Sequence, residues 1–238
     1  MSKRSFAFCF ALTVLSLGPV ARAQEEDPGP AVPTTAAPRA AGGAIEFGLR
    51  TGYGIPLGHT GRAAGDTSDD ALSSSIKGEI PLWLDLGYRF DPRMYLGLSF
   101  QYAFGLVPSD QCDSGVSCSV SDMRLGANFI YHVTPTQPAD LWLGFGVGYE
   151  WLRMSASSDR GISGDATGSG FEFANFQAGV DFAVTPAFAL GPFVSFSLGE
   201  YRTLSLSGGG SSADQDIVSK SLHEWLVLGV RGSFDVHL

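Results

Sequence analysis

The chain has 238 residues, of which 44% are hydrophobic and only 16% are charged, and its formal net charge at pH 7 is −9. The length suits one domain with flanking segments, and the acidic balance argues against nucleic acid or an anionic surface as a partner. Beyond the N-terminus no apolar run reaches the roughly 18 residues of a membrane-spanning helix. Apolar residues recur instead at every second position, which predicts an all-β protein.

Residues 1–23 are typical of a secretory signal peptide. Lys3 and Arg4 form a basic start, an apolar stretch follows, and Ala21-Arg22-Ala23 has the small-x-small pattern of a cleavage site. Three of the 15 basic residues lie in this segment, so the exported chain would keep 12 basic residues against 24 acidic ones. Residues 24–43 contain four prolines and nothing to bury, and we expect a disordered periplasmic lead.

Eight stretches with one apolar face follow, as expected for strands. They cover residues 44–55, 79–90, 94–105, 120–132, 140–152, 171–184, 188–198 and 222–238. Most have about 12 residues, whereas globular strands usually have about 5 to 6 and membrane-spanning strands need about 9 to 11. The pattern therefore predicts an eight-stranded antiparallel up-and-down transmembrane β-barrel over residues 44–238.

The connections between these strands alternate in length. Three are short and contain proline, at 91–93, 133–139 and 185–187. Four are long, polar and expected to be loops, at 56–78, 106–119, 155–170 and 208–219. Short periplasmic turns and long outer loops are typical of an outer-membrane barrel, so we expect both termini on the periplasmic side.

Two cysteines, Cys112 and Cys118, lie close together in one of the long polar connections. In an exported chain this spacing favours a disulfide that closes a small loop. A metal site is the alternative, but no histidine or third cysteine stands nearby in the sequence, so no metal is expected.

The apolar face of the strands is too large to be packed inside the barrel. It carries roughly 40 to 45 side chains, whereas the interior of an eight-stranded barrel is only just wide enough for side chains to fill it. The opposite face is rich in glycine. We therefore expect the apolar face to contact lipid, with aromatic residues forming a girdle near each end of the strands.

Two residues fit this face poorly. Pro192 removes a ladder hydrogen bond within a strand, so we expect a bulge there. Glu224 also points outward, but it lies near the outer end of its strand, where a charge costs about 0 to 1 kcal/mol.

The inward face carries nine charged residues and three tryptophans. These are Glu46, Arg50, Asp85, Arg89, Arg124, Glu150, Asp181, Arg231 and Asp235, with Trp83, Trp142 and Trp225. Charges in so narrow a space must pair, because an isolated buried charge is too costly. A ladder of ion pairs that plugs the lumen is the favoured interpretation. The alternative is an Arg–carboxylate pair that opens as a gate for ions.

A catalytic site is not evident. Ser221, His223 and Glu224 have suitable types, but parity places Glu224 on the opposite face from the other two, so they form no triad. His59, His132 and His237 are scattered and belong to no recognisable catalytic signature. We therefore expect no enzymatic activity and no cofactor, and a lipid-modifying barrel enzyme is kept only as an alternative.

The alternation of strands and loops over residues 44–238 resembles the small eight-stranded outer-membrane barrels, the group that includes the transmembrane domain of outer-membrane protein A. The resemblance implies contact with outer-membrane lipid and lipopolysaccharide, and with the barrel-assembly machinery. The chain departs from the group in two ways. We expect no C-terminal peptidoglycan-binding domain, and the sequence ends in Val236-His237-Leu238, where an aromatic residue is usual.

These patterns predict a non-enzymatic barrel in the outer membrane. Its role would be structural or adhesive through its outer loops, whose ligand the sequence does not reveal. A narrow porin-like channel for ions or small solutes is the main alternative, and a soluble secreted barrel is a further one.

Overall fold

A computed structural model describes residues 42–63, 71–109, 112, 114–159 and 161–237. The predicted signal peptide and nearly all of the predicted lead lie outside the described residues. The described part contains ten strands and one short helix. These are β1 (Ala44–Gly58), β2 (Arg62–Ala63), α1 (Leu72–Ser75), β3 (Gly78–Arg89), β4 (Met94–Leu106), β5 (Val116–His132), β6 (Ala139–Ser158), β7 (Ser163–Thr185), β8 (Phe188–Gly208), β9 (Ser211–Ser219) and β10 (Leu222–His237).

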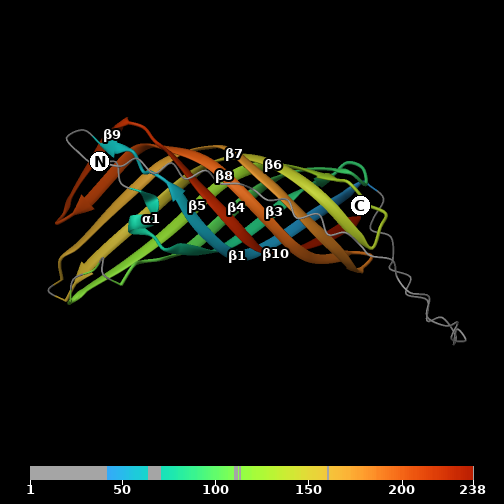
Figure 1. Cartoon of the computed structure of the whole chain (residues 1–238), viewed down its shortest axis with the longest axis horizontal. Coiled ribbons are helices and arrows are strands. Elements are labelled where there is room, and N and C mark those ends of the chain that lie inside the picture. The colour runs from blue at the N-terminus through green and yellow to red at the C-terminus, as the bar shows by residue number, and fades with distance from the viewer. Residues whose placement is uncertain (1–41, 64–70, 110–111, 113, 160, 238) are drawn as a thin grey trace, which may run out of the picture. The chain divides into compact units, whose positions relative to one another are not determined.

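Eight of the described strands close into an antiparallel barrel (Figure 1). The order of neighbours is β10, β1, β3, β4, β5, β6, β7 and β8, and β8 pairs back onto β10 to close the sheet. Each barrel strand therefore pairs with the barrel strands before and after it in the chain, and β10 pairs with β1. The predicted eight-stranded up-and-down barrel is confirmed.

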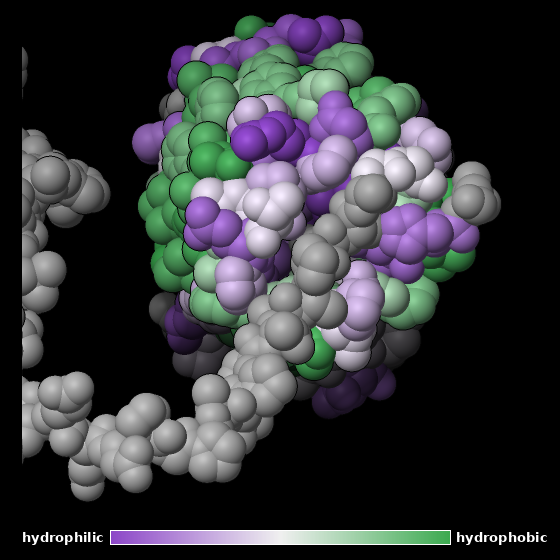
Figure 2. Space-filling view, turned by 90° about the vertical axis from the view of Figure 1, so that its right-hand side faces the viewer, coloured by the Kyte–Doolittle hydropathy of each residue, from purple (hydrophilic) through white to green (hydrophobic). Residues whose placement is uncertain are grey.

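The alternation of side chains along each strand separates an apolar outside from a buried inside. On β3 and β4, Leu84 and Leu98 expose 53% and 64% of their surface, whereas Trp83 and Gln101 expose 4% and 1%. Figure 2, which views the end that carries the short turns, shows polar residues gathered on the end face and hydrophobic residues around the side. The apolar face thus lies outside, as predicted.

Helix α1 has only four residues. In the part of the chain that the structure describes, no helix is long and apolar enough to cross a membrane.

Two of the predicted long loops are wrong, because the strands continue through them. Strands β6 and β7 extend the ladder to the pair Ser157 and Ser163, and β8 and β9 pair from Thr203–Asp216 to Gly208–Ser211. Composition misled the prediction here, since these segments are rich in serine, glycine and aspartate. Backbone hydrogen bonds can hold two strands together without apolar side chains. Where both faces of a strand carry small polar residues, apolar residues no longer recur at every second position.

The other two predicted long loops also contain ordered elements. Residues 56–78 include β2 and α1, and Leu72 and Ile76, within and just after α1, are fully buried against Trp225 and Tyr201. Strand β5 begins four residues earlier than predicted, at Val116. The barrel mouth is therefore partly filled by its own first connection.

The bulge predicted at Pro192 is wrong. The pairing of β8 with β10 runs through Pro192 opposite Val230 without a shift. The pairing of β8 with β7 lacks two rungs at this point and then resumes in the same register at Phe182 and Leu190. The missing N–H of proline thus interrupts the ladder without adding a residue. The irregularities between these two strands lie elsewhere, including one between Glu172 and Ala174.

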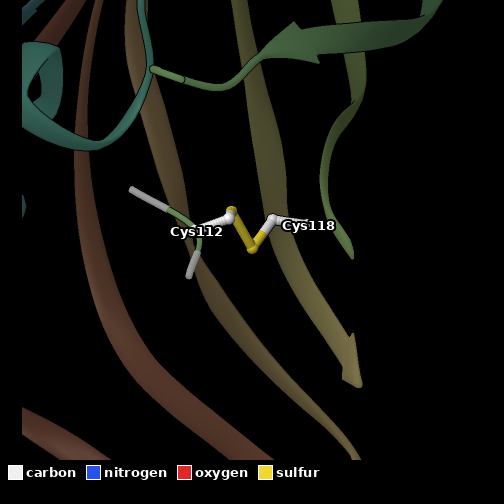
Figure 3. The surroundings of a disulfide bond; sticks show 2 residues. All are labelled: Cys112 and Cys118. Atoms are coloured by element: carbon white, nitrogen blue, oxygen red, sulfur yellow. A yellow bond between two sulfur atoms is a disulfide. The ribbon is translucent and has the colours of Figure 1, made fainter. Parts of the chain in front are cut away.

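The predicted disulfide is present. Cys112 and Cys118 are bonded with their Cα atoms 6.3 Å apart (Figure 3), and Cys118 lies near the beginning of β5. The bond therefore ties the connection after β4 to the beginning of β5.

Candidate functional site in the barrel interior

The structure places all nine charged residues and all three tryptophans named from the sequence inside the barrel, each exposing 6% of its surface or less. Close packing inside needs glycines on the facing strands. At Gly179 a Cβ would lie 2.5 Å from the ring of Trp142, and at Gly199 it would lie 2.7 Å from Nε2 of His223. Glycine at these positions lets the large rings lie flat against the wall.

Seven of the nine charges form a paired cluster, which contains the side chains of Glu46, Arg50, Asp85, Arg89, Asp181, Arg231 and Asp235. Arg231 donates to Glu46 and, at 2.5 Å, to Asp181. Arg89 also donates to Glu46, and its Nε lies 3.9 Å from Asp235. Arg231 thus bridges carboxylates of the non-adjacent strands β1 and β7, whereas Arg89 contacts Glu46 and Asp235 on the paired strands β1 and β10.

Arg50 completes the paired cluster. It donates to Asp85 at 2.6 Å and to Oε1 of Gln177 at 2.6 Å. Its guanidinium carbon lies 4.6 Å from the ring centre of Trp83 and 5.6 Å from that of Trp142. The flat faces of this arginine are covered by aromatic rings while its edges bond, an arrangement that a planar guanidinium favours.

The other two predicted charges, Arg124 and Glu150, belong to a second group that we call the acidic cluster. Arg124 lies 2.6 Å from Asp122, 3.5 Å from Glu150, 3.6 Å from Glu79 and 3.8 Å from Glu172. All five side chains are buried. Four carboxyl groups therefore surround one arginine.

Sequence reasoning missed three members of this cluster: Glu79, Asp122 and Glu172. Parity could have found the first two. Asp122 is two residues from Arg124 and Glu79 is four residues from Trp83, so each shares the inward face of its strand. Glu172 lies beside a register shift of β7. Strict alternation along β7 therefore does not predict whether Glu172 points into the barrel.

His223 and Tyr201 adjoin the acidic cluster. Nε2 of His223 lies 2.9 Å from Glu150, and the phenol of Tyr201 donates to Glu150 at 2.7 Å. The two rings stack 3.9 Å apart. Nδ1 of His223 is buried without a hydrogen-bond partner among the described residues. The described contacts of the His223 ring are therefore with Glu150 and Tyr201, inside the barrel.

An apolar cavity lies beyond the acidic cluster, at the end with the extended hairpins. Its volume is about 580 Å³, and we call it the outer cup. Its lining includes the side chains of Val107, Val120, Met154, Ala156, Ala166, Leu206 and Ala213. Beneath it lies a buried apolar layer that includes Leu72, Leu152 and Trp225. Sequence reasoning missed the cup, because its walls were read as loops.

Within the described residues, no three His, Cys, Asp or Glu side chains are grouped so that they could hold a metal ion. A metal centre made of those residue types alone therefore has no support in this part of the chain.

No protein-family model and no curated protein sequence matches the chain. Among solved structures, the outer membrane protein OprG from Pseudomonas aeruginosa is 14% identical, with 84% of this chain and 98% of OprG covered and a TM-score of 0.51. The outer membrane protein AlkL is 18% identical, with 90% and 97% covered and a TM-score of 0.47. The outer membrane protease OmpT from Escherichia coli is 8% identical, with 81% and 97% covered and a TM-score of 0.44.

Only the first of these matches is strong enough to support an argument, and at this identity it bears on the fold alone. Together with the closed sheet of β1, β3–β8 and β10, it shows that the chain has the fold of the small eight-stranded outer-membrane β-barrels.

Proposed function

We propose that the protein is a non-enzymatic barrel of the bacterial outer membrane, closed to ions, that holds a small apolar molecule in its outer cup. The extended hairpins would face the outside and both termini the periplasm. Exposed leucine and phenylalanine side chains around the barrel support the membrane location, because the exposure of so large an apolar surface to water is unfavourable. Aromatic pairs near the ends of the strands, such as Tyr88–Phe90 and Tyr102–Phe104, are consistent with two girdles.

Successive layers of buried side chains support a closed lumen. The paired cluster fills the part nearer the short turns, and the acidic cluster follows. The apolar layer with Leu152 and Trp225 then lies beneath the cup. An ion would have to displace each layer in turn, which disfavours the porin-like channel.

The outer cup is the observation that carries the binding role. A volume of about 580 Å³ falls within the roughly 300 to 1,000 Å³ usual for small-molecule sites. The walls offer mainly aliphatic and thioether groups, with Met154 able to adapt to different shapes. An adhesive role, also expected from the sequence, would use the outer faces of the same hairpins and leave the cup empty.

Methionine methyl NMR can test the cup directly. Of the four methionines in the chain, Met154 lines the cup, whereas Met94 and Met123 expose 40% and 37% of their surface on the outer wall. We would titrate naphthalene into the refolded barrel in lipid nanodiscs. Saturable shifts at Met154, with linear shifts at the other two from partition into lipid, are the expected result.

A pair of variants with equal added bulk provides the control. Ala166→Trp would fill the cup, since Ala166 pairs with both Met154 and Leu206. Ala127→Trp would add the same ring on the outer wall, between Leu98 and Val147. Only the first should abolish the saturable shift. A linear response of Met154, or equal effects of the two variants, would contradict binding in the cup.

A further inference from the structure

The acidic cluster has too little positive charge for its carboxyl groups. Four carboxyl groups, from Glu79, Asp122, Glu150 and Glu172, face Arg124 at distances of 2.6 to 3.8 Å. His223, on Glu150, is the only other basic side chain that the described contacts bring to this group. Even with His223 protonated, four acidic groups meet two basic ones, and a buried carboxylate without compensation is costly.

A small cavity lies beside this cluster, next to Arg124 and Glu172. Its volume is about 10 Å³, close to the least space that one water-sized occupant needs. Polar side chains that line it include Ser99, Gln101, Arg124, Glu172 and Asn175. The occupant would therefore be single and would meet oxygen atoms on several sides.

Two amide oxygens at this cavity are left without partners. The amide nitrogen of Gln101 donates to Glu79 at 3.2 Å, and that of Asn175 donates to Glu172 at 3.2 Å. These bonds fix both amides so that the nitrogens face carboxylates. Oε1 of Gln101 and Oδ1 of Asn175 then remain buried with no hydrogen bond among the described residues. Buried acceptors of this kind normally have a partner.

We propose that this cavity binds one hard metal cation, Na⁺ or Ca²⁺, through oxygens of Gln101, Glu172 and Asn175. Hard cations take carboxylate and amide oxygens as ligands. A water molecule would satisfy the two acceptors and a proton would neutralise a carboxylate, but neither would make the stability of the protein depend on which cation the salt contains. Arg124 and Glu172 both line the cavity, and Glu79, Asp122 and Glu150 lie just behind Arg124, so the summed charge around the site still favours a cation. The site does not depend on what the outer cup binds.

The test compares salts of equal ionic strength. The protein would be refolded in detergent with NaCl, CaCl₂ or choline chloride, and its urea unfolding midpoint measured in each. A bound cation should raise the midpoint above that in choline, with an effect that saturates as the cation concentration rises. The salt that does so identifies the ion.

Variants locate the effect. Glu172→Gln and Gln101→Met should each abolish the difference in unfolding midpoint between the salts. Two variants are used so that the test still works if one of them does not fold. Asp140→Asn is the matched control, because Asp140 is a buried carboxyl group that lies outside the acidic cluster and contacts His132 at 2.6 Å. It should keep the difference. Equal midpoints in the three salts, or loss of the difference in the control as well, would overturn the proposal.

Discussion

The paired cluster and the acidic cluster are built from the same residue types inside the same barrel, but their charges are arranged differently. In the paired cluster three arginines are shared among four carboxylates, and Arg231 and Arg50 each make short hydrogen bonds to a carboxylate. In the acidic cluster a single arginine serves four carboxyl groups. The charges of the first cluster are therefore balanced to within one unit, whereas the second has three carboxyl groups more than arginines. The two clusters should therefore respond in opposite ways to the loss of a charge.

Removal of an arginine from the paired cluster should have the largest effect. Arg231→Met would remove the cation that Glu46 and Asp181 share, leaving Arg89 at Glu46 and Trp142 at Asp181. We expect the free energy of unfolding to fall by about 3 to 5 kcal/mol, as for other broken buried pairs. Urea unfolding of the refolded barrel measures it. Arg93→Met, on an exposed turn, should change the value by less than about 0.5 kcal/mol. Equal changes in the free energy of unfolding for the two variants would contradict a stabilising role of Arg231 in the paired cluster.

The same acid-to-amide change should have opposite signs in the two clusters. Asp181→Asn removes a carboxylate that accepts from Arg231 at 2.5 Å and from Trp142 at 3.1 Å, so it should destabilise. Glu172→Gln relieves repulsion in the acidic cluster, and in choline chloride it should stabilise by about 1 kcal/mol or more, the size of a unit-charge interaction at 4 Å in water. Unfolding midpoints of both variants in the same medium measure this. A loss of stability in both variants would contradict the excess of negative charge in the acidic cluster.

An exposed charge pair outside both clusters should show the smallest effect. Oδ1 of Asp165, on the hairpin of β6 and β7, accepts from Ser155 at 2.5 Å and from Arg153 at 3.3 Å. The Ser155 hydroxyl and then Arg153 lower the pKa of Asp165 below its usual value. These bonds support the hairpin at neutral pH, and their contribution is lost as the pH falls through the lowered pKa.

Ser155→Ala tests this local effect. The pKa of Asp165 should rise toward its usual value, and NMR titration of the side chain measures it. The signals of the paired cluster should stay unchanged in the same titration steps. An unchanged pKa of Asp165 in the variant would rule out the hydroxyl as the main cause.

The sequence predicted the fold well where one face of a strand is apolar. On β3, for example, the alternation of Leu82, Leu84 and Leu86 gave both the strand and its outward face. It failed on the hairpin extensions near Ser157 and Ser211, where serine and glycine occur on both faces and no apolar alternation marks the strand. The helix α1 was also missed, because one buried turn of chain has no periodic pattern.

The interior could be predicted only in part. Parity along a strand tells which side chains point inward, as for Arg50 and Arg124. It does not tell which of them meet, because the strands tilt and the contacts cross the lumen: Arg50 on β1 bonds Gln177 on β7, and Arg124 on β5 approaches Glu172 on β7. The imbalance of the acidic cluster and the outer cup depend on these cross-lumen contacts.

Single-channel recording in a planar lipid bilayer tests the central claim, that both clusters and the apolar layer above them close the barrel. The refolded protein should show no steady openings above background at either sign of voltage, because an ion would have to break the bridge of Arg231 and then cross the layer of Leu152 and Trp225. Steady, uniform openings from the wild-type protein would contradict the closed lumen and favour the channel.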